Sequence, residues 1–202
     1  MFEVIFDIET KTFFDETGTK DPADLGVSIV SVYSREFDLE NGEIRGEMSS
    51  FFEKDIDKMW GKFLNADRII GFNSNHFDVP ALKNYAPSGF NKLPHFDILE
   101  HIRDAFGHRA SLNSVAKATL GELKVDSGAN EVKYFQSGDP ESLRKLQYYC
   151  EADVMITKKV YDFGYKNGYL NLVDFWNTER KLMVNFRYPN NGQGVLKQTS
   201  LF

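Results

Sequence analysis

Three short motifs carry acidic residues of the kind that bind divalent cations. The motifs are FDIET, GFNSNHFD and YYCEAD, and their candidate residues are Asp7, Glu9, Asp78, Tyr149 and Asp153. Carboxylate oxygens are ligands that hard cations such as Mg²⁺ and Mn²⁺ prefer. Two such cations at a phosphodiester stabilise both the attacking and the leaving oxygen during cleavage. The chemistry that these residues favour is therefore metal-dependent hydrolysis of a nucleic-acid chain.

The first motif ends a predicted buried strand. Residues 2–9 (FEVIFDIE) are rich in β-branched and aromatic side chains and are followed by turn formers. Asp7 and Glu9 are two residues apart, so a strand projects both from the same face. Two like charges there raise each other's pKa unless a cation or a hydrogen-bond donor intervenes. The alternative is that Asp7 caps a turn and Glu9 is a solvated residue at the strand end.

The third motif lies within a predicted helix over residues 140–163, with Pro140 suited to its first turn. Tyr149 and Asp153 are four residues apart and therefore share one helix face. Apolar residues flank that face, which places Asp153 at the border of the core, where a carboxylate needs a partner. The alternative is an ordinary surface aspartate beside a tyrosine of the core.

The second motif joins a predicted strand over residues 68–72 to a predicted helix over 77–85. Asp78 falls in the first turn of that helix, where the helix macrodipole favours a negative charge. The alternative role for Asp78 is therefore to stabilise the helix start. Asn73 lies in the connecting loop and could contact a phosphate or a base edge, although Asn is common in turns.

The order of the three motifs resembles the DEDD superfamily of 3′–5′ exonucleases, the proofreading type with a ribonuclease H-like fold. The position of Tyr149, four residues before Asp153, resembles the pattern of the tyrosine (DEDDy) branch of that superfamily. The segment LPHFDILEHIRDAFGHRASLNSVAKATLG resembles the proofreading domains of family B DNA polymerases. It is closer still to small stand-alone ribonuclease H-like exonucleases. The resemblance covers residues 2–170.

The resemblance implies two divalent cations, Mg²⁺ or Mn²⁺, as cofactors. Asp7 would bridge them, Glu9 and Asp153 would complete the site for the attacking water, and Asp78 would hold the second cation. Tyr149 would orient the water. A tyrosine with an ordinary pKa near 10 is a poor base at neutral pH, so the cations would do most of the deprotonation.

The implied substrate is the 3′ end of DNA, single-stranded, in repair or replication. Substrate contacts are expected from residues in or beside the first two motifs, namely Ile8, Thr10, Asn73 and Phe77. Phe77 could stack on a terminal base, and core packing is its alternative role. RNA is the alternative substrate, because none of these residues selects between 2′-OH and 2′-H. A non-catalytic module that binds nucleic acid or a partner protein is a third reading.

Length and composition agree with one enzyme domain of 202 residues, which is long enough to bury a core. The single cysteine, Cys150, excludes an internal disulfide and suits a reducing cytoplasm. The first core strand begins at the N-terminus without a leader segment, and no apolar run is long enough for a membrane helix. We therefore expect a cytoplasmic protein without a membrane partner.

The net charge of −6 is unevenly distributed. The first hundred residues carry the acidic excess, and residues 101–202 carry an excess of Lys and Arg. The expected phosphate contacts lie in this second half: Arg103, His108, Arg109, Lys117, Lys124, Lys133 and Lys145. An enzyme that binds the end of a nucleic-acid chain through metal ions contacts few phosphates and needs no strongly basic surface.

The expected domain spans residues 1–188, followed by a flexible tail over 189–202 that is rich in Asn and Gly. The last five residues, QTSLF, resemble the Q-x-x-L-F peptide with which bacterial enzymes dock on the sliding clamp. Gln198 would hydrogen-bond to the clamp, and Leu201 and Phe202 would enter an apolar pocket. The alternative is a hydrophobic tail that folds back onto the domain.

The remaining pattern completes an α/β prediction. It consists of strands over 27–34 and 44–52, helices over 52–64, 98–106 and 111–120, and a strand pair within 171–189. Such an order predicts a layered fold, and the resemblance specifies it as a ribonuclease H-like central mixed β-sheet flanked by helices on both faces. The polar loop over residues 11–26 is expected beside the active site.

Overall fold

A mixed five-stranded sheet forms the centre of the protein. The computed structural model describes residues 1–122, 130–173 and 178–189. The strand order across the sheet is β3-β2-β1-β4-β5. The strands are β1 (Phe2–Thr10), β2 (Val27–Asp38), β3 (Gly42–Phe52), β4 (Arg68–Gly71) and β5 (His95–Asp97). β1 pairs antiparallel with β2 and parallel with β4, so the sheet is mixed, as expected.

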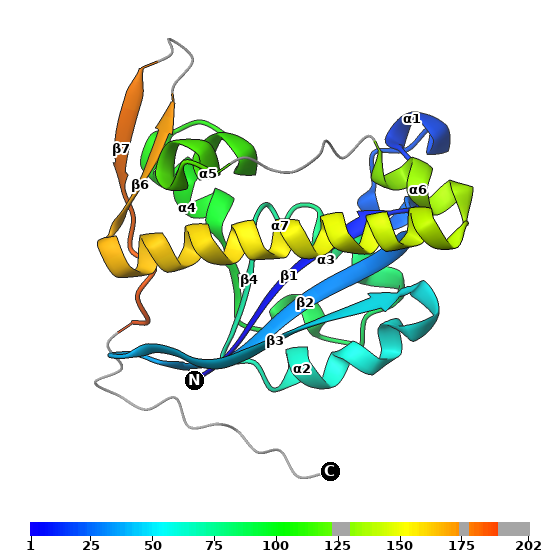
Figure 1. Cartoon of the computed structure of the whole chain (residues 1–202), viewed down its shortest axis with the longest axis horizontal. Coiled ribbons are helices and arrows are strands. Elements are labelled where there is room, and N and C mark those ends of the chain that lie inside the picture. Colours follow the sequence, from blue (N-terminus) through cyan, green and yellow to red (C-terminus); the bar gives the residue numbers. More distant parts are fainter. Residues whose placement is uncertain (123–129, 174–177, 190–202) are drawn as a thin grey trace.

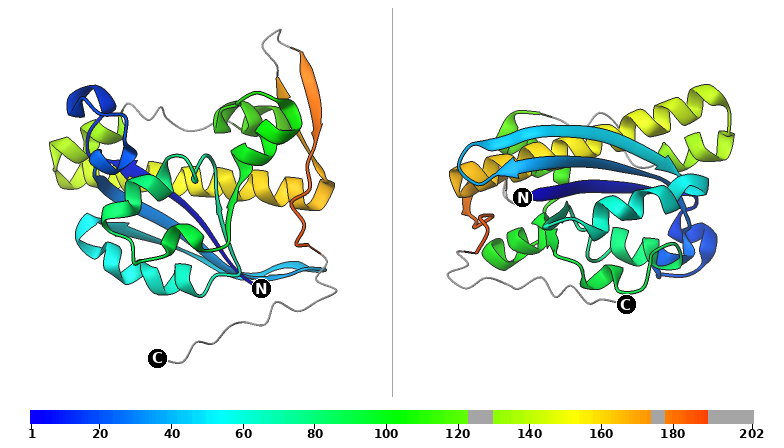
Figure 2. Two further views of the ribbon diagram at one scale, coloured as in Figure 1. Left: turned by 180° about the vertical axis from the view of Figure 1, so that it is seen from behind. Right: turned by 90° about the horizontal axis from the view of Figure 1, so that it is seen from below.

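Helices cover both faces of this sheet (Figures 1 and 2). The helices of the described residues are α1 (Phe14–Thr17), α2 (Trp60–Leu64), α3 (Asp78–Ala81), α4 (Ile98–Phe106), α5 (Leu112–Leu120), α6 (Glu131–Ser137) and α7 (Pro140–Asn167). α7 crosses one face, and α2 and α3 pack on the other. None of the described helices is both long and apolar enough to span a membrane.

Alternation along β1 divides its side chains between two cores. Val4, Phe6 and Ile8 point to the α2 face, where they pack with aromatic and aliphatic residues of α2 and its neighbours. Ile5 points to the α7 face and packs with Val154. Because strand side chains alternate with a period of two, Asp7 and Glu9 share the α7 face with Ile5. The strand thus delivers both acids of the first motif toward the long helix.

Residues 53–64 form a different structure from the continuous α-helix that the sequence predicts. A 3₁₀ helix spans Glu53–Met59, and only the last turn, α2, is α-helical. Ile56 and Met59 are buried and three residues apart. In a 3₁₀ helix, side chains at this spacing lie directly above one another, so both apolar residues reach the core.

A second, two-stranded sheet consists of β6 (Tyr169–Val173) and β7 (Glu179–Met183), paired antiparallel. The strand pair that the sequence predicts is therefore present. It stands beside α5 and apart from the main sheet (Figure 1). The Thr119 hydroxyl donates to the Asn171 carbonyl at 2.8 Å and accepts from the Asn171 N–H at 3.0 Å. These two bonds fix β6 to α5.

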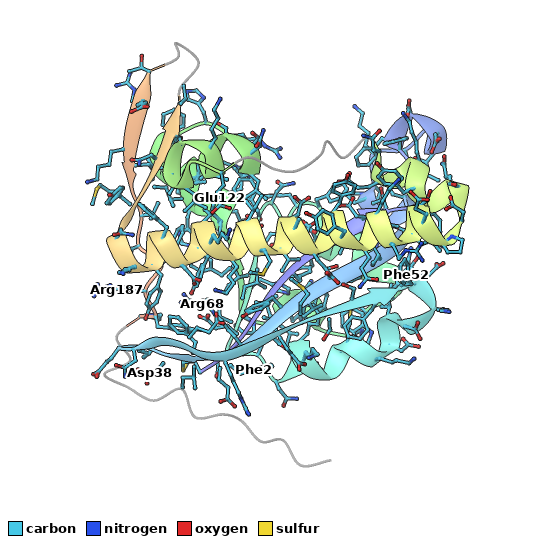
Figure 3. The ribbon with its side chains drawn as sticks, in the orientation of Figure 1. Phe2, Asp38, Phe52, Arg68, Glu122 and Arg187 are labelled. Carbon is cyan, nitrogen blue, oxygen red and sulfur yellow. The ribbon has the colours of Figure 1, made fainter. Side chains whose placement is uncertain are left out.

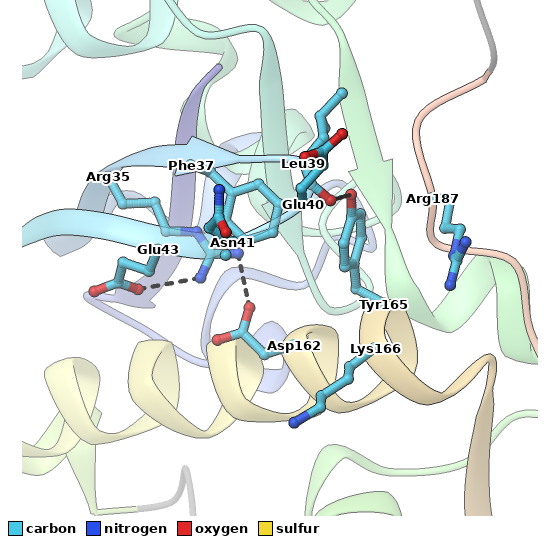
Figure 4. A pocket seen from close by; sticks show the side chains of 11 residues that line it. Arg35, Phe37, Leu39, Glu40, Asn41, Glu43, Asp162, Tyr165, Lys166 and Arg187 are labelled. Carbon is cyan, nitrogen blue, oxygen red and sulfur yellow. Dashed lines mark hydrogen bonds and ion pairs between the residues drawn. The ribbon is translucent and has the colours of Figure 1, made fainter.

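A buried charge network fills the N-terminal end of β1, on the α7 side. The Arg35 guanidinium is fully buried and pairs with Glu3 at 2.7 Å and with Asp162 at 2.7 Å. Figure 4 shows Arg35 pointing toward Asp162 and Glu43. The carboxylate of Glu3 also accepts hydrogen bonds from the hydroxyls of Tyr161 and Tyr188. Burial of Glu3 is therefore compensated by a cation and by phenol donors.

The same network holds the segment after β7 against the main sheet. Arg68 of β4 lies on the side of the sheet that faces the C-terminal half of α7 (Figure 3). Its guanidinium donates at 2.6 Å to the Tyr161 hydroxyl and at 2.6 Å to the Phe186 carbonyl. Phe186 is fully buried and stacks on Tyr161. Residues up to Tyr188 are thus tied to β1, at the end opposite to Asp7 and Glu9.

Candidate metal centre

Four acidic side chains from three elements line one pocket at the C-terminal end of β1. Asp7 and Glu9 come from β1, Asp78 from the start of α3, and Asp153 from the middle of α7. The pocket measures about 200 Å³. The remaining lining residues are Ile8, Phe72, Asn73, Phe77 and Leu112. The fold therefore brings together all four predicted acids, together with three of the four predicted substrate contacts.

Cys150 lies behind the acids and packs as a neutral thiol. Its side chain is fully buried, and its Sγ lies 3.6 Å from the Asp7 carbonyl oxygen. Burial raises the pKa of the Cys150 thiol well above its usual range, and the nearby Asp7 and Glu9 raise it further. Mg²⁺ and Mn²⁺ prefer oxygen ligands. The thiol therefore supports β1 from α7, as a packed residue, while the carboxylates are the suitable ligands.

Asp78 is a carboxyl whose charged form is disfavoured by burial. The side chain is 4% exposed at the first position of α3. Burial and, to a smaller extent, the charge of Asp97 raise the pKa of Asp78, backbone N–H groups of Asp78 itself and Ile8 oppose the shift, and the net pKa is about 7. A cation in the pocket would favour the ionised form. This arrangement therefore fits a group that becomes fully charged when metal binds.

Asp97 shapes the loop that carries the second motif. It ends β5 and caps α4, and its carboxylate accepts from the backbone N–H groups of Asn73 at 2.8 Å, Asn75 at 3.0 Å and Leu99 at 2.9 Å. Asn73 adopts a left-handed backbone conformation, with φ of 66°. Asp97 is therefore a strand-end residue that stabilises the turn after β4.

Close packing inside this loop requires the glycine that precedes it. Gly71 ends β4, and a Cβ atom there would lie 2.4 Å from the Cβ of Ser74. No side chain fits in that space, so the loop can fold back tightly over the strand end. The tight turn directs Asn73 and Phe77 into the acidic pocket.

Glu131 is a further acidic residue of this region and lies outside the three sequence motifs. It is the first residue of α6 and is fully buried. Carboxylate oxygens of Glu9, Glu131 and Asp153 all lie within 4.8 Å of one another. A glutamate directly before an apolar helical pattern (Val132, Tyr134, Phe135) gives little sign of burial, because such residues commonly favour a helix N-terminus from the surface.

Tyr149 lies one helical turn before Asp153 on α7 and is half-buried. Its ring stacks on Tyr134 of α6, with centroids 5.8 Å apart and planes 13° apart. Tyr149 is not among the residues that line the acidic pocket. The structure therefore places Tyr149 one turn from Asp153 and outside the lining of the acidic pocket, with its ring stacked on α6.

Thr10, the fourth predicted substrate contact, lines a neighbouring pocket of about 260 Å³. Glu9 and Phe77 line both this pocket and the acidic one. Phe14 of α1 packs edge-to-face on Phe77, with ring centroids 6.2 Å apart. The loop over residues 11–26 therefore lies beside the candidate site, as the sequence predicts.

Two exposed arginines bring positive charge to the second-motif loop. Arg109 donates to the Asn73 side-chain oxygen at 2.9 Å, and Arg103 lies 3.1 Å from the ring of His76. Arg103 and Arg109 were both expected to contact phosphates. Lys124, another of the expected contacts, lies outside the described residues, as do Gln198, Leu201 and Phe202 of the predicted clamp-binding tail. Those assignments stay predictions.

The chain is similar to known proteins over most of its length. A family model described as the RNase_H superfamily matches residues 4–165. The DNA polymerase delta catalytic subunit of Candida albicans is 26% identical over 192 residues, covering 74% of this chain and 18% of that protein. The corresponding subunit of Oryza sativa subsp. japonica is 27% identical over 158 residues, covering 57% and 14%. The chain thus spans less than a fifth of these relatives.

A solved structure supports the same fold. The family B DNA polymerase of the hyperthermophilic archaeon Pyrobaculum calidifontis superposes with a TM-score of 0.57 and 22% identity, covering 81% of this chain and 24% of that chain. The ribonuclease H-like fold and the resemblance to family B polymerases are therefore confirmed. Because the family model covers most of the sequence, the chain belongs to the RNase H superfamily.

Proposed function

We propose that the protein is a metal-dependent 3′–5′ exonuclease that removes nucleotides from single-stranded DNA. The observation that carries this proposal is the convergence of Asp7, Glu9, Asp78 and Asp153 on one pocket. These acids come from distant parts of the chain, and a fold has little reason to collect four carboxylates unless cations neutralise them. Membership of the RNase H superfamily and similarity to DNA polymerase subunits support a nucleic-acid substrate.

The acids would hold two divalent cations, Mg²⁺ or Mn²⁺. When bound, the cations supply charge stabilisation for the attacking and leaving oxygens of the phosphodiester. Asp7 and Glu9 act from the rigid end of β1, and Asp153 acts from α7 across the pocket. Asp78 faces them from α3. Carboxylate oxygens fit these hard cations, and the charge of the cations would favour the ionised form of the buried Asp78.

The terminal nucleotide would lie along the second-motif loop. Asn73 and Phe77 line the acidic pocket with Ile8, and Thr10 lies in the adjoining pocket that shares Phe77. An aromatic ring there can stack on a base of any sequence. Tyr149 would orient the attacking water from one turn before Asp153. Arg109, which hydrogen-bonds to Asn73, would contact the phosphate backbone.

Cleavage of end-labelled oligonucleotides tests this function. Wild-type protein and Asp7→Ala are incubated with 3′- and 5′-labelled single-stranded DNA and RNA, in Mn²⁺ or EDTA. We expect a ladder of 3′ shortening on DNA that EDTA and the mutation both abolish. Preferred cleavage of RNA would instead support a 3′–5′ exoribonuclease. If the wild-type protein cleaved neither DNA nor RNA, the result would contradict the proposal of an enzyme and favour a non-catalytic binding module.

Recruitment by a sliding clamp is a further part of the proposal. It rests on the QTSLF sequence at residues 198–202. Tethering raises the effective concentration of an enzyme at DNA without new contacts in its active site. Deleting the five residues should abolish binding to a bacterial clamp in a pull-down and leave cleavage of free oligonucleotides intact. Clamp binding that survives the deletion would show that the tail assignment is wrong.

A further inference from the structure

We propose that Glu131 is a fifth carboxylate of the metal centre and holds the cation on the Glu9–Asp153 side. This inference rests on the proposed function, because it assigns a ligand to the same site. Carboxylate oxygens of Glu9, Glu131 and Asp153 lie within 4.8 Å of one another. One cation placed among three oxygens at such spacing can contact all of them directly or through its bound water.

Glu131 is a fully buried glutamate that lies close to two further carboxylates, those of Glu9 and Asp153. Like charges in a buried setting repel strongly, and a divalent cation among them turns the same arrangement into a favourable one.

The position of Glu131 is fixed by the packing of α6. Tyr134 and Phe135 of this helix pack against an apolar cluster that contains Ile29 of β2 and Cys150 of α7. Val132, the next residue after Glu131, is buried as well. Because two elements of the metal centre, β1 and α7, both contact α6, the helix holds Glu131 at a set distance from Glu9 and Asp153.

The arrangement assigns Glu131 to one cation rather than to both. The carboxylates whose oxygens lie within 4.8 Å of one another are those of Glu9, Glu131 and Asp153, and Asp78 is not among them. Asp78 lines the acidic pocket from α3. Replacing Glu131 should therefore weaken the cation site of Glu9 and Asp153 and spare the one of Asp78.

Titration of the full-length protein with Mn²⁺ in a calorimeter tests this assignment without measuring activity. The variants are Glu131→Gln, Asp78→Asn and, as a matched control, Glu141→Gln. Glu141 is an exposed glutamate in the first turn of α7 that pairs with Lys145. We expect two Mn²⁺ sites in the wild-type protein and in Glu141→Gln. In Glu131→Gln, one site should weaken by about tenfold or more, the typical effect of disturbing the groups around a metal.

A double mutant identifies which site is affected. If Glu131 serves the Glu9–Asp153 cation, Glu131→Gln and Asp78→Asn weaken different sites, and their combination weakens both. Glu131→Asp keeps the charge and should keep part of the affinity even if Glu131→Gln folds poorly by circular dichroism. Unchanged Mn²⁺ affinity in folded Glu131→Gln would overturn the inference alone. A wild-type protein that binds no Mn²⁺ would instead overturn the proposed function.

Discussion

Tyr134 of α6 stacks on Tyr149 of α7, with ring centroids 5.8 Å apart and ring planes 13° apart. A stacked pair of this kind stabilises its geometry by about 0.5–1.5 kcal/mol beyond apolar burial. Tyr149 is half-buried, so ring contacts such as this one help to set where its hydroxyl points. α6 thus contacts the predicted catalytic tyrosine through Tyr134 and carries Glu131, whose carboxylate lies within 4.8 Å of those of Glu9 and Asp153.

Removal of this stack should slow catalysis. Tyr134→Ala frees the ring of Tyr149, and we expect turnover to fall by up to about tenfold, the rate equivalent of the lost stacking energy. Tyr134→Phe keeps the ring and should keep near-wild-type turnover. Single-turnover cleavage of a labelled DNA strand measures the effect. Equal turnover in Tyr134→Ala and wild type would show that Tyr149 needs no support from α6.

The raised pKa of Asp78 predicts that the protein without bound metal loses stability as the pH rises. Its folded pKa is raised from 3.8 to about 7, so between these values the folded protein holds a proton that the unfolded chain has released. The contribution of protonated Asp78 to the free energy of unfolding is fully present below pH 3.8 and is lost as the pH rises through about 7. A shift of this size corresponds to a loss on the order of a few kcal/mol.

Thermal unfolding in EDTA from pH 4 to pH 8 measures this dependence. Asp78→Asn cannot ionise, so its melting temperature should fall less over the same range. Mn²⁺ favours the ionised carboxylate and should raise the wild-type melting temperature more at pH 8 than at pH 5. Parallel pH profiles for wild type and Asp78→Asn would contradict the predicted shift.

The buried pair of Arg35 and Glu3 should be needed for folding and irrelevant to metal binding. Arg35→Met leaves Glu3 buried without its cation, and we expect the free energy of unfolding to fall by about 3–5 kcal/mol. Arg45→Ala is the matched control, because Arg45 forms an exposed pair with Glu36 that contributes about 0–1 kcal/mol. Urea unfolding compares the two. A similar loss in both variants would contradict the structural role of the buried network.

Much of the fold could be predicted from local patterns along the chain. The alternation of β1 and the apolar stripe of α7 are each contained in one segment, and α5 is capped by Ser111, a residue type that favours the N-cap position. The helix predicted over 52–64 was wrong in its first half, because buried residues three apart suit a 3₁₀ helix equally well. β5 has three residues and α6 has seven, too few to show a period.

Those residues of the candidate site that belong to a sequence motif could be predicted. The residue whose position depends on tertiary packing could not. Asp7, Glu9, Asp78 and Asp153 stand in motifs whose order has a known meaning, and the fold brings all four to one pocket. Glu131 belongs to no such motif, and its burial depends on contacts between α6 and two elements distant in sequence. Long-range contacts of this kind leave no periodic signal in the sequence.

Arg109 should contribute to substrate binding through a phosphate, not through the chemical step. It is exposed and is held at the pocket by its bond to Asn73. Arg109→Ala should raise KM for single-stranded DNA, leave kcat near the wild-type value, and reduce the slope of log affinity against log salt by about 0.7. Arg45→Ala, at the opposite end of the sheet, should change neither. A loss of kcat with an unchanged salt slope would mean that Arg109 positions Asn73 for catalysis instead of binding the DNA backbone.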